Sequence, residues 1–516
     1  MLPVYRMKPK PSSFPHSMEP SGGDGEVATK RAKPSSDDAG GGGGEDRLSA
    51  LPDDILVLIL LRLLTPAAAR TSVLSRRWRR VWALLPELRF LRAPDLHRIG
   101  AVLDAHEAAL RYLFVETRDA AAGSAAAWLP AAARRVTGRL LFHNLDEGGG
   151  AQEDGDEEIF ELPCLESATS ASLHLGFLGL AVPPAGVFAR LTELSLARVR
   201  FHRSGELGDA VSSPRCPCLQ KLTVHDSRGL GNLIIHSDSL QQVELRDLSG
   251  LQQLSIVAPA LQVVDVMKCF YHDHNELVAS ISAPQLVTLV WIDDPRVPSS
   301  VQLGEMEHLE LLGPSLYLVY GLQDSTLNHA CLSFLRRFKV IEGLIITLAY
   351  LPKIDNCQYL MEDMTMLPNI TFLRLIVLTN GHAFGASAFH VLRMCSGIRR
   401  LLLAFPATDV EAQKTCPSGC ICGDQHNWET DQLLLNCLQE VEITPFRGSE
   451  HEVTFVKQLF DWATVLQKMT VSFDYSVTES MAKELCLVLR NFSRPEIRME
   501  FYMDEGRVKV LSAPED

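Results

Sequence analysis

The sequence predicts an α/β fold in which a small domain of three short helices precedes an irregular solenoid with one strand per repeat. Two observations carry this prediction. Residues 46–88 show the apolar spacing and the capping residues of short helices, and an apolar-x-x-apolar-x-apolar pattern returns many times from Leu191 onward. The chain has 516 residues, enough for roughly two to four domains of ordinary size.

Composition restricts the partners that the chain is expected to have. Apolar residues make up 46% of the chain, which is typical of globular proteins with a packed core. The net charge of −14 argues against general binding to nucleic acid or to an acidic membrane surface. We therefore expect no nucleic-acid partner and no membrane partner.

The N-terminal region gives no sign of secretion. Residues 1–20 contain no apolar run, and the most apolar stretch, 55–64, is interrupted by Arg62 and is too short to span a bilayer. We expect an intracellular protein, located in the nucleus, the cytoplasm or both, with mostly reduced cysteines. Residues 1–45 are predicted to be disordered. Within them, residues 30–33 (KRAK) fit either a nuclear localisation signal or an ordinary solvated tail.

The first predicted helix follows Asp53 and is apolar on all sides beyond Asp54, with Arg62 as its single charge. Asp53 is expected to cap this helix by accepting hydrogen bonds from the amides of its first turn. A helix that is apolar all round has to be buried on every side.

Two further short helices are predicted to follow. Thr65 suits an N-cap and Pro66 suits the first helical position, so the second helix is expected over 67–74. Ser75 is expected to cap a third helix, whose apolar face consists of Trp78, Val81, Trp82 and Leu85. Three such helices cannot bury this much apolar surface among themselves, so the surplus indicates a partner. The alternative is that the segment only caps the end of the repeat stack.

The repeating pattern defines the larger part of the fold. The last two apolar positions of each unit are two residues apart, so both side chains point to one face of a strand. One strand cannot bury that face alone, whereas stacked units build a continuous core. The units start mostly about 20 to 30 residues apart, which is a solenoid period; an ordinary α/β domain with Leu-rich strands is the alternative. The units are Leu191-Leu194-Leu196, Leu219-Leu222-Val224, Leu240-Val243-Leu245, Leu261-Val264-Val266, Leu286-Leu289-Trp291, Met306-Leu309-Leu311, Ile341-Leu344-Ile346, Ile370-Leu373-Leu375, Ile398-Leu401-Leu403, Leu438-Val441-Ile443 and Leu466-Met469-Val471.

These units resemble leucine-rich repeats, with two departures. The Asn or Cys that usually follows the strand is largely missing, with Cys269 as the clearest candidate, and the spacing widens in places. The resemblance implies a concave surface lined by the residues between the buried positions. These residues are the target-binding candidates, and we expect them to be exposed charges that contribute little to folding: Glu193, Lys221, Glu244, Arg246, Asp265, Glu310 and Arg374.

The helical segment resembles a plant F-box. The resemblance rests on residues 51–56 (LPDDIL), on residues 73–79 (VLSRRWR) and on Trp82. It implies docking on a Skp-type adaptor, which joins F-box proteins to a cullin scaffold. Leu64, where relatives often carry Pro, and Ala67, where an acidic residue is common, depart from the family pattern. By resemblance, the adaptor-binding candidates are Leu51, Pro52, Ile55, Ile59 and Trp78.

The C-terminal region resembles the FBD domain, an α/β module of plant F-box proteins. The resemblance starts at Cys416-Pro-Ser-Gly-Cys420-Ile-Cys422, includes Trp428 and continues to Val471. Together, the matches identify the chain as a member of the plant F-box/leucine-rich-repeat/FBD family. The expected divisions are a disordered tail at 1–45, an F-box domain at 46–88, an irregular leucine-rich-repeat region at 89–415 with an acidic loop at 146–158, and an FBD domain at 416–516.

The C-terminal cysteines offer ligands for a zinc site. Thiolates and imidazole suit zinc, but a Cys-x-Cys pair is tighter than the usual Cys-x-x-Cys knuckle. We therefore expect a reduced, partly exposed loop and no metal or other cofactor. The sequence also lacks a Walker-type loop, a Gly-x-Ser-x-Gly elbow and a His-Glu-x-x-His helix. The residues of suitable type are Cys416, Cys420, Cys422 and His426.

The predicted function is that of a non-catalytic substrate-recognition subunit of an SCF-type (Skp-cullin-F-box) ubiquitin ligase, which binds an unidentified target protein. One alternative is a protein-binding module outside any ligase, with the helices as a dimer contact. Another is a nucleic-acid binder that uses Arg76–Arg80 and the cysteines, against which the acidic charge counts.

Overall fold

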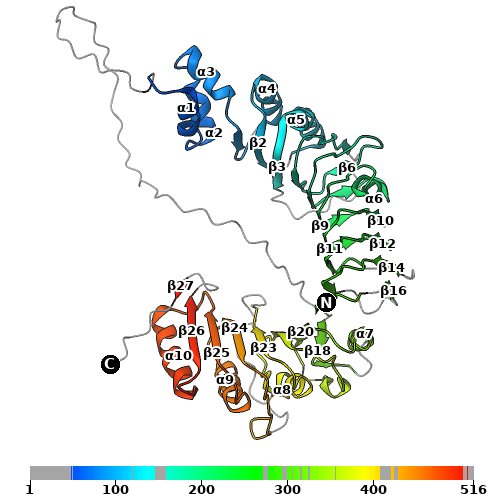
Figure 1. Cartoon of the computed structure of the whole chain (residues 1–516), viewed down its shortest axis with the longest axis vertical. Helices are drawn as coiled ribbons and strands as arrows, with labels where there is room; N and C mark the ends of the chain where they lie inside the picture. Colours follow the sequence, from blue (N-terminus) through cyan, green and yellow to red (C-terminus); the bar gives the residue numbers. More distant parts are fainter. Residues whose placement is uncertain are drawn as a thin grey trace, which may run out of the picture.

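The computed structural model describes residues 48–503 and 508–509, except 49, 94, 119, 146–158, 271–276, 293–298, 305, 314–315, 323–325, 355, 407–419 and 423–427. The predicted disordered tail, the acidic loop at 146–158, and Cys416 and His426 lie outside the described residues. Figure 1 shows the described chain as an open arc. Strands of one long sheet follow the inner side of the arc, and helices and a second sheet follow its outer side (Figure 1).

Parallel pairing runs from strand to strand along the long sheet, from the N-terminal end to β26. A solenoid with one strand per repeat requires this arrangement. In order of pairing, its strands are β1 (Glu87–Phe90), β2 (Leu110–Arg118), β3 (Val136–Leu145), β5 (Ser170–His174), β7 (Glu193–Ala197), β9 (Lys221–Arg228), β11 (Gln242–Ser249), β13 (Val263–Met267), β15 (Thr288–Ile292), β17 (Leu311–Gly313), β20 (Gly343–Ala349), β22 (Phe372–Leu378), β23 (Arg400–Ala404), β24 (Glu440–Phe446), β25 (Lys468–Phe473) and β26 (Arg498–Met503).

A second, four-stranded parallel sheet covers the outer side of the middle of the arc (Figure 1). It consists of β10 (Asn232–His236), β12 (Gln253–Val257), β14 (Leu277–Ser282) and β16 (Ser299–Leu303). The remaining strands are short: β4 (Ile159–Glu161), β6 (Gly179–Ala181), β8 (Arg200–Phe201), β18 (Leu316–Leu318), β19 (Tyr320–Gly321), β21 (Gln358–Tyr359) and β27 (Val508–Lys509).

Helices flank the long sheet at both ends of the arc. The N-terminal three stand before the first strand, and the others connect strands on the outer side (Figure 1). They are α1 (Asp53–Leu60), α2 (Thr65–Thr71), α3 (Arg76–Ala83), α4 (Leu96–Ala105), α5 (Ala122–Arg135), α6 (Glu206–Val211), α7 (Thr326–Leu335), the 3₁₀ helix η1 (Met361–Asp363), α8 (Gly385–Met394), α9 (Glu450–Trp462) and α10 (Glu479–Phe492). Among the described residues, none of these helices combines the length and the apolar character that crossing a membrane requires.

The predicted apolar positions form the core behind the sheet. Val243 pairs with Leu222 on one side and with Val264 on the other, and all three side chains are fully buried. Leu245 lies in the next buried row, beside Val224. Each such Leu or Val contributes about 1.5–3 kcal/mol by leaving water. The α/β solenoid predicted from the repeating pattern is confirmed.

One predicted unit is out of register. The sequence reading aligned Leu309 with Leu289, but the strands pair Leu312 with Leu289 and Leu311 with Thr288. The amide of Leu309 donates to the carbonyl of Met306, as the amide of Leu286 donates to that of Ala283 one repeat earlier. Leu309 and Leu312 are therefore the apolar pair of this repeat, and Leu311 faces the concave side.

The C-terminal module continues the same sheet. β24 pairs in parallel with β23, and β25 and β26 follow in register. Ser449 and Glu452 form a capping box at the start of α9, in which each side chain accepts a hydrogen bond from a backbone amide of the other residue. The region of the FBD resemblance thus adds strand–helix repeats to the solenoid.

Candidate protein-binding surfaces

The first helix leaves one apolar face uncovered. Leu56 and Leu60 are buried in the core, whereas Ile55, Leu58 and Ile59 are 38%, 58% and 36% exposed. These three residues are called the outer face of α1 below. The sequence predicted a helix that needs burial on all sides, and the part of the chain that the structure describes covers only its inner side. The uncovered remainder is a candidate interface.

Arg77 fixes the start of α1 against α3. Its Nε lies 2.9 Å from Oδ1 of Asp53, and its Nη2 donates to the backbone carbonyl of Leu51. Asp53 was predicted to cap α1, and this prediction is wrong. The helix begins at Asp53 itself, Pro52 is the N-cap residue without a side-chain hydrogen bond, and the carboxylate of Asp53 pairs with Arg77 instead.

Of the N-caps predicted for α2 and α3, only that of α3 is confirmed. Ser75 accepts a hydrogen bond from the amide of Trp78, as predicted. Thr65 is the first residue of α2 and not its cap; Leu64 is the N-cap residue and makes no side-chain hydrogen bond. The hydroxyl of Thr65 accepts from the amide of Arg89 at 2.8 Å. This bond ties α2 to β1, which is a tertiary contact that sequence spacing cannot reveal.

The five adaptor-binding candidates divide into two groups. Pro52, Ile55 and Ile59 are exposed on the helical domain. Leu51 and Trp78 are partly buried and pack against the core. Several exposed apolar side chains of the domain were not among the candidates, because an apolar helix does not reveal from sequence which side the core covers. They are Leu58, Leu63, Leu64, Val73 and Leu74.

The concave side of the sheet carries three rows of side chains in register. The first row holds Glu193, Lys221, Gln242, Val263, Thr288 and Leu311. The second holds Ser195, Thr223, Glu244, Asp265 and Val290. The third holds Ala197, His225, Arg246, Met267 and Ile292.

Four charged or titratable side chains of these rows form a connected group, called the charged ladder below: His225, Glu244, Arg246 and Asp265. Oε1 of Glu244 lies 3.4 Å from Nε2 of His225 and 3.0 Å from Nη2 of Arg246. The same Nη2 lies 2.5 Å from Oδ2 of Asp265. The side chains of Glu244, Arg246 and Asp265 are only 17%, 30% and 15% exposed. The prediction that these are exposed charges is wrong, because each shields its neighbour from solvent.

Burial and pairing shift the pKa values of Glu244 and Asp265, the two carboxylates of the charged ladder, in opposite directions. The contact with His225 is the largest influence on Glu244 and, with Arg246 and Lys221, holds its pKa below the ordinary value against the effect of burial. Burial dominates at Asp265 and raises its pKa, and the charge of Glu244 adds to this, although Arg246 opposes both. Glu244 therefore holds its negative charge to lower pH than usual, whereas Asp265 is a weaker acid than an ordinary aspartate.

Four target-binding candidates lie outside the charged ladder: Glu193 and Lys221 in the first row, and Arg374 and Glu310. Arg374 is in the second row of a later repeat, between Ile345 and Leu402. Glu310 was predicted to point from a strand into the concave side, and this prediction is wrong. Glu310 precedes β17, and its amide donates to the carbonyl of Val287, which holds the equivalent place before β15. The shifted register of this repeat is the reason.

A second charged cluster on the concave side was not predicted. Nη2 of Arg400 lies 3.3 Å from Glu442, and Glu500 lies 3.0 Å from Lys468 and 2.7 Å from Arg498. These residues and Glu440, which lies 3.8 Å from Arg400, are called the C-terminal ladder. The repeating pattern could have found Arg400, Glu440, Glu442 and Lys468, which lie on the strands of predicted units, whereas Arg498 and Glu500 lie on β26, where no unit was predicted.

The N-terminal repeats add aromatic and cationic groups. His143 lies 5.1 Å from Phe114 and 6.1 Å from His174, measured between ring centroids. Phe177 lies between the guanidinium groups of Arg198 and Arg228, at 4.7 and 4.8 Å. Cation–aromatic pairs of this kind contribute about 0.5–2 kcal/mol. The repeat region was predicted to begin at residue 89, but no individual unit was identified before Leu191, so the positions of Phe114, His143 and His174 on this surface were not predicted.

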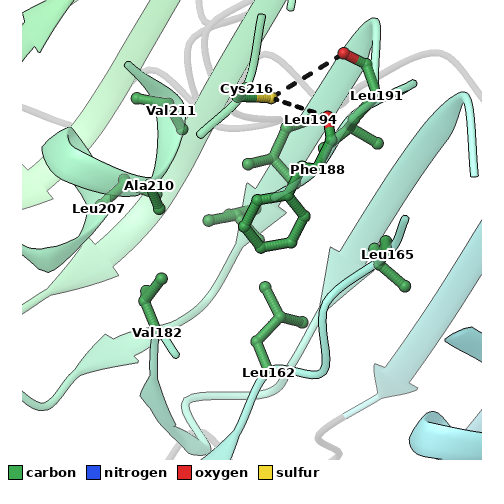
Figure 2. A pocket seen from close by; sticks show the side chains of 11 residues that line it. Leu162, Leu165, Val182, Phe188, Leu191, Leu194, Leu207, Ala210, Val211 and Cys216 are labelled. Atoms are coloured by element: carbon green, nitrogen blue, oxygen red, sulfur yellow. Dashed lines mark hydrogen bonds between the residues drawn. The ribbon is translucent and has the colours of Figure 1, made fainter. Parts of the chain in front are cut away.

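A pocket lined by residues of β7 and α6, among others, contains no group suited to catalysis or to binding a polar ligand. Figure 2 shows its lining of aliphatic side chains with Phe188 and Cys216. The thiol of Cys216 lies 3.8 and 3.9 Å from the carbonyls of Phe188 and Leu191, the contacts drawn as dashed lines (Figure 2). Burial raises the pKa of Cys216 to about 12, so the thiol stays protonated. We interpret the pocket as part of the core.

The C-terminal cysteines lie beside a histidine that the sequence reading did not include. Cys420 and Cys422 are grouped with His382, whereas Cys416 and His426 are outside the described residues. One ligand atom of each of the three residues lies within 4.8 Å of the other two.

Comparisons with known families match three successive parts of the chain. Residues 48–90 match the F-box domain, residues 125–313 match the LRR repeats of the FBD-associated F-box protein At5g56370, and residues 432–471 match FBD. The chain is also similar to the putative F-box/FBD/LRR-repeat protein At4g03220 of Arabidopsis thaliana, with 26% identity over 341 residues. This match covers 62% of the chain and 66% of the relative.

Each of the three matches coincides with one structural part of the chain. The F-box match covers the helical domain with its uncovered apolar face, the repeat match covers the strands that carry the charged ladder, and the FBD match covers β24, α9 and the first strand residues of β25. The chain belongs to the plant F-box/leucine-rich-repeat/FBD family.

Proposed function

We propose that the chain is the substrate-recognition subunit of an SCF-type ubiquitin ligase. The observation that carries the proposal is the uncovered outer face of α1 on an F-box domain, at one end of an arc whose inner side is lined by charged side chains. The F-box binds a Skp-type adaptor, and through it a cullin scaffold. The concave side binds a target protein.

The two surfaces differ in chemical character, as expected if each binds a different kind of partner. The outer face of α1 is apolar, as expected for a permanent contact that excludes water. The concave side alternates charges of both signs, which favours selective recognition of a protein over binding to a uniform polyanion. The two surfaces belong to different elements of the fold, so one chain can hold both partners together.

The proposed contribution to ubiquitin transfer is proximity. A receptor that holds the target beside a ubiquitin-conjugating enzyme raises the local concentration of target lysines. The chain itself is then non-catalytic. In agreement with this, burial raises the pKa of Cys395 to about 12 and of Cys486 to about 11, which makes these thiols poor nucleophiles at neutral pH. The proposal also implies an intracellular location, in the nucleus, the cytoplasm or both.

The proposal is tested by capture of the full chain from plant cells in which the proteasome is inhibited. Wild-type chain should retain a Skp-type adaptor, a cullin and a ubiquitinated target. The Ile55→Asp variant should retain the target but neither ligase component, because the aspartate would be buried without a partner in the interface.

Two outcomes would contradict the proposal. Equal recovery of adaptor and cullin with the Ile55→Asp variant would show that the outer face of α1 is not the docking surface. Recovery of a target without any adaptor from the wild-type chain would favour a protein-binding module that acts outside a ligase.

A further inference from the structure

His382 lies in a tight turn that orients its side chain toward the C-terminal module. The turn follows β22 and precedes α8, and the amide of His382 donates to the carbonyl of Thr379 at 2.9 Å. Asn380 and Gly381 have positive φ angles of 46° and 82°, a conformation that Asn and Gly adopt most readily. The amide side chain of Asn380 donates to the carbonyl of Tyr350 at 2.7 Å. These two hydrogen bonds fix the backbone of the turn that carries His382.

The two ring nitrogens of His382 have different surroundings. Nε2 lies 3.1 Å from the backbone carbonyl of Leu351, and the ring stacks on Tyr350 with centroids 5.9 Å apart and planes at 21°. A carbonyl can only accept, so the proton of the neutral ring resides on Nε2. Nδ1 then presents a lone pair, and it lies 3.5 Å from Sγ of Cys420. A carbonyl that accepts from the distal nitrogen is the usual second partner of a metal-binding histidine.

Cys422 completes a group of three soft ligand atoms. The imidazole nitrogen and the two sulfur atoms all lie within 4.8 Å of one another, and both His382 and Cys422 are buried. Tetrahedral zinc with ordinary bond lengths places N and S ligands about 3.6 Å apart and two S ligands about 3.8 Å apart. The separation between Nδ1 of His382 and Sγ of Cys420, 3.5 Å, is close to the N···S value, and the other two separations, which are at most 4.8 Å, have to shorten at most to the zinc values.

Aromatic packing holds the cysteine segment against α8. The indole of Trp428 lies over Gly385 so closely that a Cβ there would be 2.1 Å from Cζ2. Trp428 also packs on Phe455 and Trp462 of α9, with ring centroids 5.7 and 6.0 Å away. Trp428, which follows the two cysteines in the sequence, therefore packs against both α8 and α9.

We propose that His382, Cys420 and Cys422 bind a zinc ion. Thiolate and imidazole ligands select zinc over hard cations such as magnesium and calcium. His382, Cys420 and Cys422 supply three ligands, and water takes the fourth position of the tetrahedral ion. The ion joins the turn after β22 to the segment before β24. This site replaces the metal-free loop that the sequence predicted, because spacing along the chain cannot reveal a ligand 38 residues away.

Elemental analysis of the purified full chain tests the proposal. Wild-type chain, expressed with zinc in the medium, should contain about one zinc per chain, as a single site of this type requires. The Cys420→Ser/Cys422→Ser double variant and the His382→Ala variant should lose it. The matched control is Cys437→Ser, since Cys437 is exposed and outside the group; it should keep its zinc. Far-UV circular dichroism of each variant establishes that the solenoid is folded.

A titration of metal-stripped wild-type chain with Co²⁺ keeps the proposal testable if the variants misfold. Binding should saturate at about one equivalent and give thiolate-to-cobalt charge-transfer absorption together with strong visible bands of tetrahedral cobalt. Absence of stoichiometric zinc with no such absorption would overturn the proposal and leave a thiol–imidazole hydrogen bond. Full zinc content in the folded double variant would overturn it as well.

Discussion

Arg246 and Asp265 bind each other across neighbouring strands of the concave sheet: Nη2 of Arg246 lies 2.5 Å from Oδ2 of Asp265. The same nitrogen lies 3.0 Å from Oε1 of Glu244, so one guanidinium forms ion pairs with two carboxylates. The charges that face a potential target are thus already paired with one another. A pre-organised group of this kind loses less conformational entropy on binding than separate mobile side chains.

Replacing Arg246 with Met should destabilise the solenoid. Glu244 and Asp265 would remain as partly buried carboxylates without their shared cation, at a cost of about 1–2 kcal/mol once partial exposure is considered. The measurement is the midpoint of urea unfolding. The Glu244→Gln/Arg246→Met/Asp265→Asn variant, which leaves no unpaired charge, should recover part of the loss. An unchanged midpoint for Arg246→Met would contradict the pairing.

The same uncharged triple variant should lose target capture. Its side chains keep nearly the shape of the originals, so the fold is retained while the charge pattern that selects the target is removed. Capture from cells measures the effect, with Glu310→Gln as the control, since Glu310 is exposed but precedes the strand. Normal capture by the triple variant would show that the target binds elsewhere, at the C-terminal ladder or at another surface.

The stability of the folded chain should fall below pH 6.5. Burial lowers the pKa of His143, helped by the charge of His174, and burial also lowers the pKa of His174 and of His106 from the ordinary value of 6.5. Between the lowered and the ordinary values, the unfolded chain binds more protons, so stability decreases as the pH falls through this window.

Thermal unfolding as a function of pH measures this dependence. The His143→Gln/His174→Gln variant should show a weaker dependence in the same window, because two of the three contributing groups are gone. A variant that retains the full wild-type dependence would show that these two half-buried histidines do not cause it.

Replacing Gly385 with Ala should disturb the docking of the C-terminal segment. A Cβ at this position would meet the ring of Trp428 at 2.1 Å, and overpacking of this kind costs about 1–3 kcal/mol. The control is Gly123→Ala in α5, where nothing lies within 4 Å of the added atom. The thermal unfolding temperature should fall for Gly385→Ala alone; equal behaviour of both variants would contradict the packing.

The sequence predicted most of the solenoid because its signal is periodic. Leu222, Val243 and Val264 repeat the same local pattern, and their pairing follows from it. The repeat at Leu309 was placed wrongly, because Met306, Leu309, Leu311 and Leu312 offer two overlapping apolar patterns and only pairing with β15 decides between them.

The candidate sites depended on tertiary contacts that no local pattern contains. Asp53 pairs with Arg77, 24 residues away, instead of capping its own helix. Cys420 meets His382 from another repeat. Exposed and buried charges occupy equivalent strand positions, so the burial of Glu244 and Asp265 could not be predicted from spacing.

The central claim is that the outer face of α1 docks a Skp-type adaptor. The most direct test is a calorimetric titration of purified full-length chain with purified adaptor, using wild type, the Ile55→Asp/Ile59→Asp variant and the control Leu434→Asp. Leu434 is an exposed apolar residue in the C-terminal region, so the control carries the same kind of change outside the F-box domain.

The account predicts saturable one-to-one binding by the wild type and the control, and at least about a hundredfold weaker binding by the double variant, since about 2.7 kcal/mol is lost when buried apolar contacts are replaced by unpaired charges. Circular dichroism should show all three chains equally folded, because Ile55 and Ile59 are exposed in the chain alone. Equal adaptor affinity of the folded double variant and the wild type would contradict the account.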